Sequence, residues 1–347
     1  MHPLRLHPWT SFINDLKEKV RVGEKDVLLL EVEAACEEAL LRVHSESHVS
    51  IIKALSRGVE VKVLGSFGVA SYLPPDTPVV PGIFELMLHL IGGAIQAGRM
   101  VWSGSVRNAM AFGGQHHALT YYSSGFCYFN DVAVMIEWLR EKADLRRVAI
   151  FDFDGHHGNG TQFIYNEDPD VLYISFHQTH DPFGEKIYPG TGWIEDIGAG
   201  EGKGFKVNLP LPVGATDEDY DYALNEVFRP LVEEFKPELL VANGGFDAHR
   251  SAALLNLSLT LHGYLNIAET LVEAAEKVCG GRLVVLTGVG YSPEVVRRGL
   301  TIILGTLLGK PVVVDEEKTE ERGVKKEVIR RVAQIKGVLK EYWGCYR

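Results

Sequence analysis

The sequence predicts an α/β fold in which one central, largely parallel sheet is flanked by helices on both faces. Short apolar segments at 148–151, 171–177, 239–242 and 283–286 have the length and composition of strands buried on both sides. Polar loops follow them, and stretches with helical spacing follow the loops, a rhythm typical of doubly wound sheets. In such folds, functional side chains gather beyond the carboxyl ends of the strands.

Composition and charge indicate a globular protein and argue against nucleic acid or a membrane as its partner. The chain has 347 residues, 46% of them hydrophobic and 23% charged, which suits a globular protein with a sizeable core. A net charge of −11 argues against nucleic acid as the main partner, because phosphate binding needs clustered Lys and Arg. No apolar run approaches the ~20 residues of a membrane span, and the first twenty residues lack the apolar core of a signal peptide. We expect a cytoplasmic protein without a membrane partner.

The four cysteines are scattered and show no CxxC spacing. We therefore expect neither a disulfide framework nor a thiolate zinc site. They are Cys36, Cys127, Cys279 and Cys345.

Helical spacing predicts helices in the N-terminal part of the chain, and His44 and His48 fall in a predicted loop between two of them. We expect these histidines to be exposed or to cap a helix, because such roles are more common than metal binding. A metal-binding role remains the alternative. The expected helices are at 11–20, 34–43, 48–57 and 83–97.

The segment SYLPPDTPVVPG at 71–82 contains four prolines, which can neither continue a helix nor donate to a central ladder. It predicts a rigid loop that presents Asp76, either as a turn residue or as a functional side chain.

Helix-start signals predict the remaining helices. One begins near Asn130, one has Thr216 as its N-cap with acidic residues in its first turn, and one covers 260–278. Another helix follows Tyr291, and the charged tail at 315–347 predicts a solvated amphipathic helix packed on the body.

The stretch VAIFDFDGHHGNGTQ at 148–162 organises the chain. A buried strand runs into Asp152, Asp154 and His156, which lie on alternate positions and so leave extended backbone on one face. Asp247 follows the strand at 239–242 in the same way. Taken alone, such residues are often caps or turn residues. Taken together, two carboxylates and one imidazole with an open position suit Zn²⁺ or Fe²⁺.

Three further side chains add acid, base and electrophilic chemistry. His116 and His117 are adjacent in the loop GGQHHAL, and because adjacent side chains diverge they must serve different roles in one site. Histidines supply general acid and base catalysis. Tyr291 follows a glycine turn and could donate to a developing oxyanion. With a metal that activates water, this set predicts hydrolysis of an amide or ester.

Nine segments, in order, resemble the motifs of the histone deacetylase superfamily, closest to its acetoin-utilisation branch and to the class I enzymes. They cover about residues 40–305, and the resemblance implies the arginase/deacetylase fold in a single domain over 1–347. The segments are VHSES, PPDTPVVPG, GGQHHA, SGFCYFND, DFDGHHGNGTQ, YPGTGWIEDIGAGEG, VNLPLPVG, GGFDAHR and GVGY.

The resemblance implies that Asp154, His156 and Asp247 hold a catalytic zinc and that His117 is the general base and later the acid. It further implies that Asp152 orients His116 as an electrostatic partner, Asn159 orients His117, and Tyr291 polarises the acetyl carbonyl. The implied substrate contacts are Asp76, Gly125, Phe126, Tyr188 and Gly290. A structural K⁺ is also implied, at the backbone of Asp152, Asp154 and His156 with Ser175 and Phe176.

The chain departs from the family pattern at four places. Asn159 stands where an Asp is common, so His117 meets a neutral amide and its pKa is expected to be less raised. Tyr188 replaces a usual Phe, residues 251–253 replace Gly-Asp-Pro, and Pro8 stands near the position of an N-terminal arginine, with Arg5 as a candidate substitute.

Several functions share these residues. The leading interpretation is a zinc-dependent deacetylase acting on acetyl-lysine in proteins; an acetylpolyamine or other small-amide deacetylase is the alternative. A binding module for acylated lysine would be expected to lack a ligand, a base or Tyr291, all of which are present. A ureohydrolase with two manganese ions would need more acidic ligands than this chain offers.

Overall fold

The computed structural model describes residues 27–347 except 62, 66, 67, 71–73, 75, 289, 320 and 321. The predicted helix at 11–20, Arg5 and Pro8 lie outside the described residues, as does part of the proline-rich loop.

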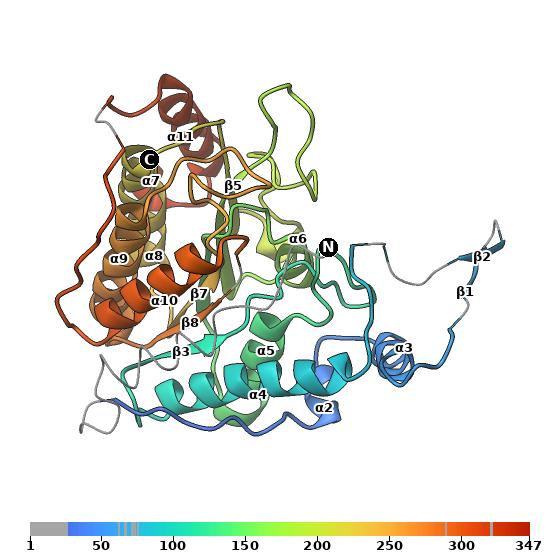
Figure 1. Cartoon of the computed structure of the whole chain (residues 1–347). Helices are drawn as coiled ribbons and strands as arrows, with labels where there is room; N and C mark the ends of the chain where they lie inside the picture. Colours follow the sequence, from blue (N-terminus) through green and yellow to red (C-terminus); the bar gives the residue numbers. More distant parts are fainter. Residues whose placement is uncertain are drawn as a thin grey trace.

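A six-stranded sheet forms the centre of the molecule, with the strand order β3-β8-β7-β4-β5-β6 and only parallel pairs (Figure 1). This confirms the predicted α/β architecture. The four predicted strands are the four central ones. The strands are β3 (Asn108–Phe112), β4 (Val148–Asp152), β5 (Val171–Gln178), β6 (Lys206–Leu211), β7 (Leu239–Gly244) and β8 (Leu283–Thr287), beside a separate antiparallel pair, β1 (Val63–Gly65) and β2 (Gly68–Ala70).

Both edge strands, β3 and β6, were missing from the predicted set. β3 is half-buried throughout, and β6 carries Lys206 and Pro210 among its apolar residues. A proline is tolerated at a sheet edge, where one side of the strand needs no ladder bonds. The Lys206 Nζ is buried and donates to the carbonyls of Asp168 (2.9 Å) and Val171 (2.6 Å), so its N–H groups are hydrogen-bonded inside the protein, and burial lowers its pKa to about 7.

Helices cover both faces of the sheet, and alternate residues of β4 show how the two cores form. Val148 and Ile150 belong to a core built with α4 and α5, whereas Ala149 and Phe151 belong to a larger core with α9 and α10. Figure 1 shows these helices around the sheet. The longer helices are α3 (Glu46–Ser56), α4 (Ile83–Trp102), α5 (Asp131–Ala143), α9 (Leu261–Cys279), α10 (Pro293–Leu307) and α11 (Lys326–Leu339); the shorter ones are α2 (Glu37–Leu40), α6 (Asn159–Ile164), α7 (Asp217–Ala223) and α8 (Arg229–Phe235).

The predicted helix starts agree with the structure. The Asn130 side chain accepts from Ala133 N at 2.9 Å and begins α5, and Thr216 forms a capping box with Asp219 at the start of α7. The predicted helix at 34–43 is shorter, covering only α2. The predicted C-terminal helix at 315–347 is shorter as well: α11 covers Lys326–Leu339 and packs on the body, as predicted, through Val328, Val332, Ile335 and Leu339.

The expectation of exposed or capping histidines at 44 and 48 was wrong. Both side chains are buried against Phe129, where their rings make edge contacts. His44 Nδ1 lies 3.0 Å from the carbonyl of Leu119, and His48 Nε2 lies 3.0 Å from that of Tyr128. They hold the loop that follows β3, and the structure does not bring them to the site described below. Among the described residues, no helix combines the length and apolar character needed to cross a bilayer.

Two adjacent glycines on α4 provide a matched test of packing. A Cβ on Gly92 would lie 1.9 Å from the backbone oxygen of Glu33, whereas a Cβ on Gly93 would meet Val32 at an ordinary 3.5 Å. We expect Gly93→Ala to raise the free energy of unfolding by up to about 1 kcal/mol, the usual helical gain. Gly92→Ala should lower it by about 1–3 kcal/mol, because backbone must shift. Urea unfolding of both variants measures this, and equal effects would contradict the packing described.

Candidate active site

The site lies beyond the carboxyl ends of four neighbouring strands. The loop after β3 carries His116 and His117, that after β4 carries Asp154 and His156, and the loops after β7 and β8 carry Asp247 and Tyr291. Parallel strands bring their carboxyl ends to one edge, so residues far apart in sequence meet there.

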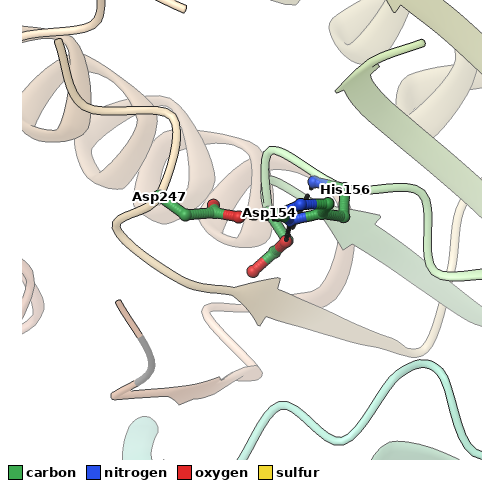
Figure 2. A group of neighbouring side chains, drawn as sticks. All are labelled: Asp154, His156 and Asp247. Atoms are coloured by element: carbon green, nitrogen blue, oxygen red, sulfur yellow. Dashed lines mark hydrogen bonds and ion pairs between the residues drawn. The ribbon is translucent and has the colours of Figure 1, made fainter. Parts of the chain in front are cut away.

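Asp154, His156 and Asp247 form a buried cluster (Figure 2). Their exposed fractions are 7%, 7% and 2%. His156 Nδ1 lies 2.6 Å from Asp247 Oδ2 and 3.4 Å from Asp154 Oδ1. The backbone N–H of Gly155 donates to Asp247 Oδ1 at 2.7 Å, and that of His156 donates to Asp154 Oδ1 at 2.9 Å. These bonds fix both carboxylates relative to the imidazole.

Opposite charges govern protonation in this cluster. Burial lowers the pKa of His156, but Asp247 and Asp154 outweigh burial and raise that pKa to about 10. Burial also acts to raise the pKa of Asp154, yet His116 and His156 hold it well below its usual range. The cluster therefore holds a positive charge between carboxylates, which is the electrostatic environment of a bound cation.

The cluster fits a divalent metal ion. One ligand atom from each of the three residues lies within 4.8 Å of the others, and it is the one such group found among the described residues. Two carboxylates and one imidazole suit Zn²⁺ or Fe²⁺, and three protein ligands leave positions for water and substrate, as catalytic sites require. Metal binding would displace the proton held by His156, because an imidazole ligand must be neutral.

His116 is held by a buried carboxylate. Its Nδ1 donates to Asp152 Oδ2 at 2.8 Å, and its Nε2 lies 3.8 Å from Asp154 Oδ1. The hydroxyl of Tyr173 donates to the same Asp152 oxygen at 2.9 Å. Burial lowers the pKa of His116, but the two aspartates raise it overall, to about 9. His116 is therefore an imidazolium at neutral pH.

His117 is in the opposite state. Its Nδ1 lies 2.7 Å from the amide oxygen of Asn159, which can only accept, so Nδ1 carries the proton and Nε2 has a free lone pair. Burial first, and then the charges of His116 and His156, hold its pKa well below the usual value. The ring centroids of His116 and His117 are 4.1 Å apart. The site thus places a charged and a neutral imidazole side by side.

Two of the predicted wall residues, Gly125 and Tyr188, pack against His117. Gly125 has φ +56°, and a Cβ there would lie 2.4 Å from His117 Cδ2 and 2.8 Å from Tyr188 Cε1, so only glycine fits. The rings of Tyr188 and His117 meet edge to face, with centroids 5.0 Å apart. Phe126 is half-buried, and its backbone N–H donates to the hydroxyl of Thr77 at 3.1 Å. That hydroxyl donates to Asp76, so Asp76 is tied to this wall.

Tyr291 is half-buried after β8, with the buried Gly290 before it. Burial, then Asp247 and Asp154, raise the pKa of its phenol, so it stays protonated and can donate a hydrogen bond. Of the residues assigned to a potassium ion, Ser175 and Phe176 are buried on β5, and Ser175 is the register partner of Asp152.

Sequence reasoning missed the residues that support the site. Asp131 is buried and accepts from the backbone N–H groups of Gly114 and Gln115, each at 2.9 Å, which fixes the loop before His116. Tyr173 lies inside a predicted strand with no signal for its bond to Asp152. Asp131 had a partial signal, because acidic residues are favoured in the first turn of a helix, but its partners in the loop 16 and 17 residues earlier had none.

Comparisons with known proteins identify the family of this chain. A family model described as "Histone deacetylase domain" matches residues 2–307. The chain is 34% identical to "Probable deacetylase" of Archaeoglobus fulgidus, over 100% of this chain and 95% of that protein. It is 38% identical to "Histone deacetylase-like amidohydrolase" of Pseudomonas aeruginosa, over 74% of this chain and 64% of that protein.

The fold agrees as well. The crystal structure of the HDA15 HD domain superposes with a TM-score of 0.84 at 27% identity, covering 99% of this chain and 90% of that one. This bears out the arginase/deacetylase fold. The matched region contains the Asp-His-Asp cluster, the two histidines and Tyr291. The chain therefore belongs to the histone deacetylase family of metal-dependent hydrolases.

Proposed function

We propose that this protein is a zinc-dependent deacetylase that removes acetyl or other short acyl groups from acetyl-lysine side chains of proteins. The observation that carries the proposal is the neutral His117 directly beside the buried Asp154, His156 and Asp247 cluster. We assign the zinc to these three residues. An acetylated polyamine or another small amide is the alternative substrate. We also propose one domain over residues 1–347 and a cytoplasmic location.

Zinc in this cluster would lower the pKa of bound water and polarise the substrate carbonyl. His117 Nε2 accepts the proton of the attacking water, since its Nδ1 is engaged by Asn159. The same nitrogen then delivers that proton to the leaving amine, so the amide C–N bond breaks to acetate and a free amine. One imidazole thereby serves as base and acid.

Two groups stabilise the negative charge that develops on the acyl oxygen. Tyr291 keeps its proton and donates a hydrogen bond to that oxygen. His116, held charged by Asp152, contributes positive potential next to His117. Asp152 acts through His116 and is a positioning residue.

The remaining assignments concern binding. We assign Gly125, Phe126 and Tyr188 to the wall around the aliphatic stem of the substrate, Gly290 to the turn before Tyr291, and Asp76 to backbone amides at the rim. A structural K⁺ would be held at the backbone of Asp152, Asp154 and His156 with Ser175 and Phe176. Iron is the alternative catalytic ion.

The test is turnover on an acetyl-lysine peptide and on an acetylated polyamine side by side. We expect acetate release from the peptide, loss of activity with a strong chelator and recovery with Zn²⁺. A faster rate on the polyamine would select the alternative. Absence of turnover on both substrates by the zinc-loaded protein would overturn the proposal.

Metal binding itself gives a separate prediction. Asp247→Ala should weaken Zn²⁺ affinity more than about 100-fold, because a ligand and its charge are lost. Asp170→Ala, at an exposed aspartate directly before β5, is the matched control and should bind zinc normally. Competition with a chromophoric chelator measures both, and unchanged affinity in the Asp247 variant would place the metal elsewhere.

The neutral partner of His117 predicts a pH shift. Asn159→Asp puts a carboxylate 2.7 Å from Nδ1 and should raise the pKa of His117 by about 1–3 units. Since the base must be deprotonated, the acidic limb of kcat/KM should move to higher pH by a similar amount. An acidic limb at the same pH as in the wild type would argue that His117 is not the titrating base.

A further inference from the structure

We propose that Glu316 is a positioning residue that fixes the loop carrying Asp247 and thereby sets metal affinity. It lies beyond residue 307, where the match to the family model ends, in the segment between α10 and α11. The inference rests on the proposed metal-dependent function and adds a residue to that site from outside the matched region.

Glu316 binds two separate parts of the chain. Its Oε2 accepts from the backbone N–H of Leu261 at 2.7 Å, at the start of α9. His249 Nε2 lies 3.2 and 3.3 Å from its two carboxylate oxygens, and the Arg250 guanidinium lies 2.9 Å from Oε1. Its own carbonyl accepts from His262 Nε2 at 2.7 Å. The side chain is only 11% exposed, so these bonds are made largely away from water.

The hydrogen bond between His249 and Glu316 has a defined donor and acceptor. His249 Nδ1 accepts from the backbone N–H of Ser251 at 3.2 Å and lies 2.8 Å from the Ser251 hydroxyl. Nε2 therefore carries the proton and donates to Glu316. Ser251 is one of the residues at which this chain departs from the family pattern, so the loop after Arg250 is held here by Ser251 and Glu316 together.

The loop that Glu316 holds, residues 248–260, contacts the metal cluster both at its base and at its tip. At its base, Arg250 N donates to Leu259 O at 2.8 Å, and Leu259 N donates to Ala248 O at 3.2 Å. At its tip, Leu255 packs so closely on Gly155 that a Cβ there would lie 2.1 Å from its methyl group.

This loop leaves Asp247 little freedom. Gly155 lies between Asp154 and His156 in sequence and donates to Asp247 Oδ1. Asp247 itself is two residues before His249. Releasing the base of the loop would therefore loosen one metal ligand directly and the other two through Gly155.

Glu316 contributes to folding through its bonds to Leu261 and His249, which lie largely away from water, and we infer a separate effect on metal binding. The Arg250 side chain is 39% exposed, so its ion pair with Glu316 contributes little to stability. Residues that orient metal ligands, in contrast, typically change metal affinity by 10–100-fold when they are removed. A merely structural Glu316 would change the unfolding midpoint of the metal-free protein and leave its affinity for zinc unchanged.

The experiment measures Zn²⁺ affinity by competition with a chromophoric chelator, and the visible spectrum of the Co²⁺ form, for the full chain and three variants. We expect Glu316→Ala to weaken zinc binding at least 10-fold and to change the Co²⁺ spectrum. Glu316→Gln should stay within about threefold, because an amide oxygen at the Oε2 position can still accept from Leu261 and His249. Glu317→Ala, at the exposed neighbouring position, should match the wild type.

If folded Glu316→Ala gave the same zinc affinity and the same Co²⁺ spectrum as the wild type, that result would overturn the inference and leave the proposed function standing. A wild type that bound no zinc would overturn both. If Glu316→Ala does not fold, His249→Ala cuts the same link from the loop side and should weaken zinc binding at least 10-fold. Normal zinc binding by that variant would equally overturn the inference.

Discussion

The site depends on a network of three buried carboxylates and two buried imidazoles at the carboxyl ends of the strands. Each of these groups needs a partner of opposite charge. A carboxylate or imidazolium taken out of water without a partner costs several kcal/mol. Asp152 is paired with His116 at 2.8 Å, Asp247 with His156 at 2.6 Å, and Asp154 lies between the two imidazoles. Removing one of these side chains would leave another buried charge without a partner. The arrangement of the surrounding loops therefore depends on the complete network.

The sheet makes that network possible. Because every pair in the six-stranded sheet is parallel, four neighbouring strands deliver their loops to one edge, while both faces are sealed by apolar cores. The polar edge is therefore the one part of the sheet where charged groups can gather without disrupting the core. Glycines then allow close approach at the points where loops meet, as at Gly125 against His117 and Gly155 against Leu255.

The two adjacent histidines illustrate how environment assigns chemistry. His116 faces a carboxylate and has a raised pKa of about 9, whereas His117 faces a neutral amide, is buried beside two positive groups, and has a lowered pKa. Groups whose environments push their pKa values apart are suited to opposite roles in acid and base chemistry. The choice of Asn at position 159 contributes to this difference, because a carboxylate there would oppose the lowering. The same residue type thus provides a fixed charge at one position and a titratable base at the next.

Short-range signals in the sequence determined much of this protein. Apolar runs identified β4, β5, β7 and β8, since strands buried on both faces need continuous hydrophobic residues, and capping chemistry located the starts of α5 and α7. The polar residues directly after β4 and β7 indicated the site, although the chain bends at 154–156 and does not stay extended, and motif order indicated the family. Tertiary structure alone decided the edge strands β3 and β6. β3 is only half-buried, and β6, although buried, carries Lys206, Asn208 and Pro210, so neither strand shows a continuous apolar run in the sequence. Tertiary structure also decided the burial of His44 and His48, the bond from Tyr173 to Asp152, and the reach of Glu316 back to His249, since each joins residues 21 to 80 positions apart. Such contacts depend on where the chain returns in space, and no local pattern of residue types encodes that return.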